Sequence, residues 1–370
     1  MTQKRVARST RLATMPGVFV SGLQLSRAFY TEAVHPLLAD VRHSAARIGS
    51  GSEVLGFDTL RSADHEWGPR LEVFLSPADA GRIPELDRRL AERLPRTFHG
   101  WSTHFEIIEG DHVGRMAAAD GPVRHRVGIA TVDGWLERLG ADPRAGLAPA
   151  DWMALATQAL AEVTGGAVFH DGLGELEPVR AALSWYPPDV WRYVLACQWQ
   201  RIAQEEAFVG RAGEVGDELG SAVVAARLVR DLMRLALLLH RRYPPYSKWL
   251  GSAFAALPVA GALDPVLRGA LAATGWRERE QHLAAAYEAL ATAQNETGLA
   301  AAVDPTTRPY FSRPFRVLKA DRVADALLGA ITDPAVSALP RVGAIDQHAD
   351  STDLLTDAPR RRAVSRAALG

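Results

Sequence analysis

The spacing of apolar residues predicts both helices and strands in the first third of the chain. Residues 24–47 carry apolar side chains at helical spacing, with a predicted kink at Pro36. A second helical pattern covers residues 78–93. Short apolar runs typical of strands occupy residues 71–75, 105–108 and 127–130. This mixture predicts a small α/β unit in which a mixed sheet is flanked by helices.

The pattern changes after about residue 131, where alanine and leucine dominate and strand signals nearly vanish. The strongest predicted helix covers residues 217–241, and the prolines at 244 and 245 end it. One face of this helix is formed by leucines at intervals of four, three and four residues, namely Leu228, Leu232, Leu235 and Leu239. Further helices are predicted at 152–163, 189–208, 263–273, 276–297 and 321–331.

A Pro/Gly-containing stretch at residues 142–149 marks the predicted boundary between the mixed α/β part and the helical part of the chain. We therefore expect one domain over residues 1–145 and a larger helical domain over residues 146–370. The last ten or so residues, which include Arg360, Arg361 and Arg362, are expected to fray.

Composition and charge narrow the class of protein. Apolar residues make up 48% of the chain and charged residues 23%, as in ordinary globular proteins. The net charge of −1 disfavours a general nucleic-acid binder. The only cysteine, Cys197, excludes an intramolecular disulfide and fits a cytoplasmic location. Since the longest apolar run covers only residues 235–239, we expect no membrane partner.

A glycine-serine segment is the first candidate for binding chemistry. Gly51 and Ser52 are followed by Gly56, four residues after the serine. Glycines allow the backbone to approach a phosphate closely, and successive N–H groups with a serine hydroxyl can bind an anion. The alternative is a plain turn, which has the same composition.

An acidic pair, Asp64 and Glu66, follows this segment. In an extended backbone, residues two apart point to the same side, so the two carboxylates would lie together. Their repulsion is costly unless a cation neutralises it, and Mg²⁺ prefers such oxygen ligands. An exposed acidic loop is the alternative interpretation.

The order of these parts resembles the nucleotidyltransferase superfamily, which has the polymerase-β-like fold. The superfamily pattern is a glycine-serine turn with a later glycine, then a serine shortly before two acids. Here it reads Gly51-Ser52 and Gly56, then Ser62, Asp64 and Glu66. The stretches S-E-V-L-G-F-D, D-H-E-W-G-P-R, G-R-A-G-E-V-G-D-E-L-G-S and P-P-Y-S-K-W-L-G resemble a bacterial family that joins a nucleotidyltransferase core to a helical domain.

This resemblance implies an α/β nucleotidyltransferase core followed by a larger all-α domain that closes over the nucleotide. The glycine-serine turn would hold the triphosphate, and Asp64 and Glu66 would hold two Mg²⁺ ions. The superfamily supplies a third acid from a nearby strand, for which Glu106 is our candidate, with Glu72 and Glu109 as competitors.

A lysine of the helical domain commonly reaches the triphosphate in related two-domain enzymes. We expect this role for Lys248, with a surface lysine as the alternative.

Two departures from the superfamily pattern indicate an altered or inactive site. Residues 57–63 look like an insertion between the turn and the acids, and Trp67-Gly68-Pro69 interrupts the strand that would follow them.

The expected activity is magnesium-dependent transfer of a nucleoside monophosphate, AMP from ATP, to a hydroxyl group of a small molecule. In such a reaction two metal ions about 3.5–4 Å apart stabilise the attacking and leaving oxygens. Two alternatives stay open. The chain could adenylylate a partner protein, or it could be a non-catalytic nucleotide-binding or scaffold protein with a degraded site.

Overall fold

The computed structural model describes residues 19–107 and 113–370, and the chain in it forms two compact units. The first unit runs up to Thr131 and takes in Gly166–Gly174 from further along the chain. The second unit consists of Val132–Gly165 and Glu175–Gly370. The expected boundary between residues 145 and 146 thus lies inside the second unit.

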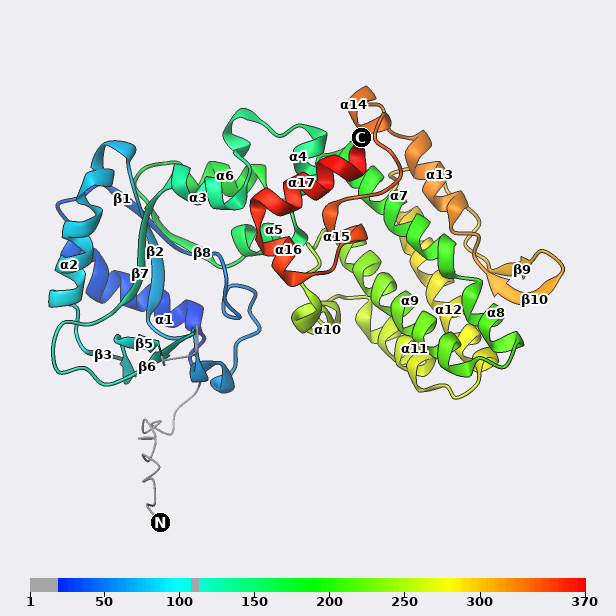
Figure 1. Cartoon of the computed structure of the whole chain (residues 1–370), viewed down its shortest axis with the longest axis horizontal. Helices are drawn as coiled ribbons and strands as arrows, with labels where there is room; N and C mark the ends of the chain where they lie inside the picture. The colour runs from blue at the N-terminus through cyan, green and yellow to red at the C-terminus, as the bar shows by residue number, and fades with distance from the viewer. Residues whose placement is uncertain (1–18, 108–112) are drawn as a thin grey trace, which may run out of the picture. The chain divides into compact units, whose positions relative to one another are not determined.

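A four-stranded mixed sheet forms the centre of the first unit (Figure 1). Its strands, in spatial order, are β7 (Arg126–Thr131), β2 (Arg70–Leu75), β1 (His43–Arg47) and β8 (Ala167–Asp171). The strand β1 is antiparallel to both of its neighbours, whereas β2 and β7 are parallel. The strands predicted at residues 71–75 and 127–130 are therefore confirmed.

The helix predicted over residues 24–47 is wrong in its second half. The helical part ends at Leu38, after α1 (Gly22–Phe29), a π-helical turn η1 (Tyr30–Val34) and a 3₁₀ turn η2 (His35–Leu38). A capping box formed by Ser21 and Gln24 starts α1. Pro36 lacks the N–H group that an α-helix would need, and after a turn at residues 39–42 the chain forms β1 instead.

Alternate residues of the strands build a hydrophobic core on one face of this sheet. Helix α1 and helix α2 (Ile83–Arg93) supply the opposing side chains. The main buried residues are Leu25, Phe29, Ala45, Leu71, Val73, Leu75, Leu86, Leu90 and Val127. Full burial of each large apolar side chain contributes roughly 1.5–3 kcal/mol. This core fixes the strand ends from which the candidate site is built.

Two short hairpins lie between α2 and β7 in the chain. The first consists of β3 (Thr97–Phe98) and β4 (Trp101–Ser102), and the second of β5 (Phe105–Ile107) and β6 (Gly114–Met116). The strand predicted at residues 105–108 is confirmed for its first three residues, and residue 108 lies outside the described part of the chain.

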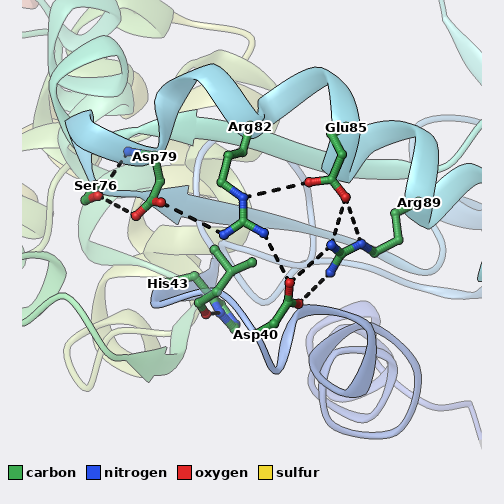
Figure 2. Close-up of polar contacts among 8 residues, drawn as sticks. Asp40, His43, Ser76, Asp79, Arg82, Glu85 and Arg89 are labelled. Carbon is green, nitrogen blue, oxygen red and sulfur yellow. Dashed lines mark hydrogen bonds and ion pairs between the residues drawn. The ribbon is translucent and has the colours of Figure 1, made fainter.

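A network of partly exposed ions at the surface ties the residues after η2 to the helical segment after β2 (Figure 2). Asp40 forms ion pairs with Arg89, at 2.5 Å between Oδ1 and Nη1, and with Arg82 of η4 (Pro77–Arg82), at 3.1 Å. Arg89 also pairs with Glu85, at 2.8 Å. Hydrogen bonds from Arg89 are the main reason that the pKa of Asp40 falls to about 2. We call these four residues the surface ion network.

The second unit is built around long helices, which confirms most of the predicted ones to within a few residues at each end. The long helices are α7 (Pro188–Glu205), α9 (Glu218–Leu239), α11 (Ala260–Ala272) and α12 (Trp276–Glu296), and the shorter α13 (Asp321–Gly329) also matches a predicted helix. Helix α9 packs against α7, α11 and α12, and its four spaced leucines are all buried. No helix within the described ranges has the length and apolarity that crossing a membrane requires.

Shorter elements complete the second unit. The helical ones are α3 (Val132–Leu139), η5 (Pro143–Ala145), α4 (Pro149–Ala154), α5 (Thr157–Thr164), α6 (Leu176–Ala182), α8 (Phe208–Glu214), α10 (Ser247–Ala255), α14 (Pro334–Ser337), α15 (Ile345–His348) and α16 (Thr352–Thr356). A hairpin of β9 (Arg308–Tyr310) and β10 (Arg313–Val317) interrupts them, so the second unit is helical but not all-α as predicted.

The C-terminus does not fray as predicted, because it forms helix α17 (Ala358–Leu369). Arg361 of this helix is buried and donates hydrogen bonds to the carbonyl oxygens of Leu139 and Ala154. These two residues end α3 and α4, whose last carbonyl groups have no partner inside their own helices. The guanidinium group therefore caps two helices at once and anchors the C-terminal segment.

Candidate functional site

The loop that follows β1 is held in place by two arginines. Arg47, the last residue of β1, donates hydrogen bonds to the carbonyl oxygens of Ile48, at 2.7 Å, and of Ser50. Arg70, the first residue of β2, donates to the same Ser50 oxygen, at 2.9 Å. Because β1 and β2 are antiparallel, the end of β1 and the start of β2 lie side by side, at what we call one edge of the sheet. The two arginines meet there and fix the start of the glycine-serine segment.

Glu53 supplies the counter-charge for these arginines. Its Oε1 atom accepts a hydrogen bond from Arg47 Nε at 2.8 Å and lies 3.7 Å from Arg70 Nε. The side chains of Arg47 and Glu53 are each only 1% exposed. Burial, with the nearby charge of Arg47, lowers the pKa of Arg70 to about 10. We call Arg47, Glu53 and Arg70 the buried ion cluster; the second oxygen of Glu53, Oε2, is buried without a hydrogen-bond partner.

The structure explains why position 51 is a glycine. Gly51 has a φ angle of +148°, and a Cβ atom there would lie 2.6 Å from Glu53 Oε2 and also overlap the Arg47 guanidinium. The backbone N–H groups of Gly51, Ser52 and Glu53, and the Ser52 hydroxyl, have no hydrogen-bond partner among the described residues. Such a row of free donors on a turn is suited to binding an anion.

Gly56 and Ser62 shape the connection that follows. Gly56 has a φ angle of +76°, which a residue with a side chain rarely adopts. The Ser62 hydroxyl accepts a hydrogen bond from the backbone N–H of Thr59 at 3.0 Å. This bond closes the start of a 3₁₀ turn, η3 (Leu60–Asp64), so that Ser62 is used within its own turn.

Asp64 and Glu66 do not lie in the extended segment that the sequence interpretation assumed. Asp64 ends η3, and its side chain is 56% exposed and pairs with His65 at 2.8 Å. Glu66 has a φ angle of +47°. Its Oε1 accepts a hydrogen bond from Gly114 N at 2.5 Å, and its Oε2 forms ion pairs with Arg70, at 3.6 Å, and with Arg126. The two carboxylates therefore share no protein partner.

The candidates for a third acid lie in different places. Glu106 is on the β5–β6 hairpin, half-exposed, with Arg124 Nη2 at 3.3 Å and His104 Nε2 at 3.6 Å. Glu72 is in the main sheet, where the absent side chain of Gly128 on β7 leaves room for its carboxylate. Glu109 lies outside the described residues.

Lys248 belongs to the second unit, in the first turn of α10. The side chain is exposed, and its Nζ atom lies 4.9 Å from the centroid of the Trp249 ring. A cation above an indole ring is a favourable contact, so this lysine has a local partner in its own helix.

The fit of these residues to magnesium is partial. Within residues 19–107 and 113–370, no three His, Cys, Asp or Glu side chains gather so that they could hold a metal ion. Mg²⁺ often takes only one or two carboxylates and completes its shell with water and phosphate oxygens. Asp64 fits this requirement because it is exposed and has one oxygen without a protein partner. Glu66 fits poorly, since Gly114, Arg70 and Arg126 occupy both of its oxygens.

The sequence interpretation missed the arginines at this edge of the sheet. Arg126, the first residue of β7, lies directly opposite Arg70 in the parallel pairing of β7 with β2. Burial, with the charge of Arg47, lowers the pKa of Arg126. The sequence signal was an arginine immediately before two of the predicted strands, Arg70 and Arg126, whereas Arg47 ends a segment predicted as helix. Only the strand order shows that the three arginines share one edge.

Comparison with known proteins adds one finding. Residues 152–250 match the model of a family described as a domain of unknown function, DUF4037. No curated protein and no solved structure matches the chain. The matched stretch includes β8 and much of the helical unit but neither Asp64 nor Glu66, so the chemistry of the first unit has to be argued from its own residues.

Proposed function

We propose that the protein transfers a nucleoside monophosphate, AMP from ATP, to a hydroxyl group of a small-molecule acceptor. The observation that supports this proposal is the free donor row of Gly51, Ser52 and Glu53 at a sheet edge with three arginines. A triphosphate presents acceptor oxygens and negative charge, which match N–H groups, a hydroxyl group and guanidinium groups.

The residues at this edge differ in how available they are to a phosphate. Arg47 and Arg70 are committed to the Ser50 carbonyl and to Glu53. Arg126 is 33% exposed, against 9% for Arg70, and its partner is the carboxylate of Glu66. We therefore assign to Arg126 the contact with a phosphate group, which it would make by exchanging Glu66 for the nucleotide.

The reaction forms a bond between the acceptor oxygen and the α-phosphorus, and breaks the bond from that phosphorus to the oxygen of the leaving pyrophosphate. The hydroxyl proton is released to solvent. Magnesium, when bound, neutralises charge on the phosphate oxygens, and Asp64 is the residue that would hold it. The role of the protein is to orient the triphosphate through residues 51–53.

A second candidate function is non-catalytic nucleotide binding. It is favoured by one observation: Glu66, the second acid of the expected metal site, is held by Arg70, Arg126 and Gly114. In such a protein the donor row and the arginines would bind the triphosphate without a requirement for magnesium.

The test is transfer of label from ATP carrying ³²P at its α-phosphate to a panel of hydroxyl compounds, with the full chain and Mg²⁺. We expect labelled acceptor and pyrophosphate to appear together, and Asp64→Asn to lower the rate by about 100-fold or more. Asp87→Asn, an exposed acid of α2, is the matched control and should leave the rate unchanged.

Binding measurements separate the two candidates. Calorimetric titration with ATP should show tighter binding in the presence of Mg²⁺ if the protein is a transferase. Equal binding with and without the ion, together with no labelled product, would favour the non-catalytic function. Full transfer activity in the Asp64→Asn protein would exclude the assigned role of Asp64.

A further inference from the structure

Glu66 occupies a place that has the composition of an anion-binding pocket. Its Oε1 atom accepts a hydrogen bond from the backbone N–H of Gly114 at 2.5 Å. Its Oε2 atom forms an ion pair with Arg126 and lies 3.6 Å from Nη1 of Arg70. One N–H group and two guanidinium groups thus converge on a single carboxylate, which is how proteins commonly bind anions. We call these three donors the Arg126 pocket.

The donors of the Arg126 pocket have supports other than the carboxylate that they hold. The guanidinium of Arg126 lies 5.7 Å from the centroid of the Phe105 ring, a favourable contact for a cation. Arg70 donates a hydrogen bond to Ser50 O at 2.9 Å. A Cβ atom at Gly114 would lie only 3.3 Å from Arg126 Nη1, so the glycine gives the guanidinium room beside its N–H group. The pocket therefore does not need Glu66 in order to exist.

The backbone of Glu66 directs its carboxylate into this pocket. The residue has a φ angle of +47°, which residues other than glycine rarely adopt. Its N–H group donates to Gly114 O at 2.8 Å, and Arg70 donates to its carbonyl oxygen. A conformation of this kind persists only where the surroundings enforce it. The contact between the carboxylate and the pocket is therefore built into the backbone of this loop.

The ion pair of Glu66 and Arg126 is within reach of solvent. The two side chains are 30% and 33% exposed, whereas those of Arg47 and Glu53 are each 1% exposed. Ion pairs that water can reach contribute little to stability, so an anion from solution can compete for Arg126. The space that such an anion would fill is the space that the carboxylate of Glu66 fills in the ligand-free protein.

Arg70 connects the Arg126 pocket to the free donor row of residues 51–53. Its Nη2 atom bonds to the carbonyl oxygen of Ser50, the residue before the row, while its Nη1 atom lies 3.6 Å from Glu66 Oε2. A ligand that binds in both places needs several negative groups in succession. A chain of phosphates has this property, whereas a single phosphate does not.

We propose that Glu66 is an autoinhibitory residue, whose carboxylate blocks the Arg126 pocket until a polyphosphate chain displaces it. The inference rests on the proposed function only for the nucleotide as the natural source of that chain. Blocking lowers the apparent affinity for a polyphosphate in proportion to the fraction of molecules in which the pocket is free. Removing the carboxylate should therefore raise this affinity.

Calorimetric titration of the full chain with sodium tripolyphosphate, without Mg²⁺ and at constant ionic strength, tests the proposal. We expect Glu66→Gln to bind the probe about tenfold more tightly than the unmodified protein, because the amide keeps the shape of the side chain and loses its charge. Glu85→Gln is the matched control, since it removes one negative charge from the surface ion network, and it should change the affinity by about twofold or less. Equal affinities of the unmodified protein and Glu66→Gln would overturn the proposal.

Glu66→Asp tests the position of the carboxylate at unchanged net charge. Its side chain is one methylene too short to keep the contacts with both Gly114 and Arg126, so the affinity for tripolyphosphate should rise by about threefold. This variant carries the test if the melting temperature shows that Glu66→Gln does not fold. An unchanged affinity in Glu66→Asp would then refute the autoinhibitory role.

Arg126→Met in the Glu66→Gln protein locates the bound probe. We expect the gain in affinity to disappear, because it depends on this guanidinium. If the gain persists, the probe binds elsewhere and the proposal is wrong. Titration with glutarate tests the chemical class of the ligand, since tighter binding of this dicarboxylate than of tripolyphosphate would overturn the assignment to phosphates.

These measurements and the assay with labelled ATP can fail separately. A gain in tripolyphosphate affinity without transfer of AMP would support the autoinhibitory role of Glu66 and count against the proposed activity. Transfer of AMP without such a gain would support the activity and refute the autoinhibitory role.

Discussion

The buried ion cluster and the surface ion network of the first unit are built from the same chemistry in different surroundings. In each, one carboxylate faces two arginines: Glu53 faces Arg47 and Arg70, and Asp40 faces Arg82 and Arg89. The Glu53 side chain is 1% exposed, whereas that of Asp40 is 55% exposed. Water and salt screen the second group and not the first. The count of ion pairs therefore says little about what each group contributes to stability.

Glu206 extends this comparison to a buried acid without a counter-ion. Its carboxylate accepts backbone hydrogen bonds from Leu318, at 2.7 Å, and Ala320, at 3.0 Å, and has no ion pair among the described residues. Burial raises its pKa to about 7, against the effect of these hydrogen bonds. Where no cation lies beside a carboxylate, its burial therefore has a larger effect on its pKa than the hydrogen bonds that it accepts.

The largest effect should follow from removing the charge of Glu53. Glu53→Gln leaves Arg47 and Arg70 buried without a carboxylate, which we expect to destabilise the first unit by about 3–5 kcal/mol. Hydrogen exchange of the β1 and β2 amides, read by mass spectrometry, measures this loss. Glu85→Gln, in the surface ion network, is the matched control with an expected cost of about 1 kcal/mol or less. Equal losses in the two variants would remove the distinction between the groups.

We expect Glu206 to have an intermediate effect on the stability of the fold, and this effect depends on pH. Its pKa is higher in the folded than in the unfolded protein, so its protonation favours folding as the pH falls below about 7. Between pH 8 and pH 5 the unmodified protein should gain about 2 kcal/mol relative to Glu206→Gln, measured by urea unfolding of the second unit. A parallel pH dependence of the two proteins would show that Glu206 titrates normally.

The smallest effect is expected in the surface ion network. Asp40→Asn should cost about 1 kcal/mol or less, and the difference should vanish in 1 M NaCl because the Asp40 carboxylate is exposed to solvent. The pKa of Asp40 is lowered in the folded protein, so its contribution is present above the ordinary pKa and lost as the pH falls towards 2. Urea unfolding at low and high salt checks this prediction, which a salt-independent cost would contradict.

Much of the fold could be predicted from local patterns, and the exceptions have a physical cause. Residues 71–75 and 127–130 are rich in branched apolar side chains, which favour strands, so both strands could be predicted from the sequence. The strand β1 reads H-S-A-A-R and lies between two neighbours with its alanines fully buried. Only tertiary packing makes such small residues form a strand, and helix propensity alone favours the opposite assignment.

In the candidate site, the turn formed by the glycines could be predicted from the sequence, but the positions and partners of the charged side chains could not. The turn at Gly51 follows from residue type, because the positive φ angle and the close contacts leave no room for a side chain. The conformation of Asp64 and Glu66 depends on η3 and on Arg126, which is distant in sequence. The pairing of side chains that converge from separate strands requires the strand order, which no local pattern contains.

The late position of β8 in the chain has a consequence for biosynthesis. This strand completes the sheet beside β1, yet it is translated only after α3, α4 and α5 of the other unit. Until the ribosome has released residues 166–174, β1 is an open edge with unpaired backbone groups, to which a second nascent chain can add. A fragment that stops at Thr131 would keep that edge permanently, so we expect it to aggregate during expression.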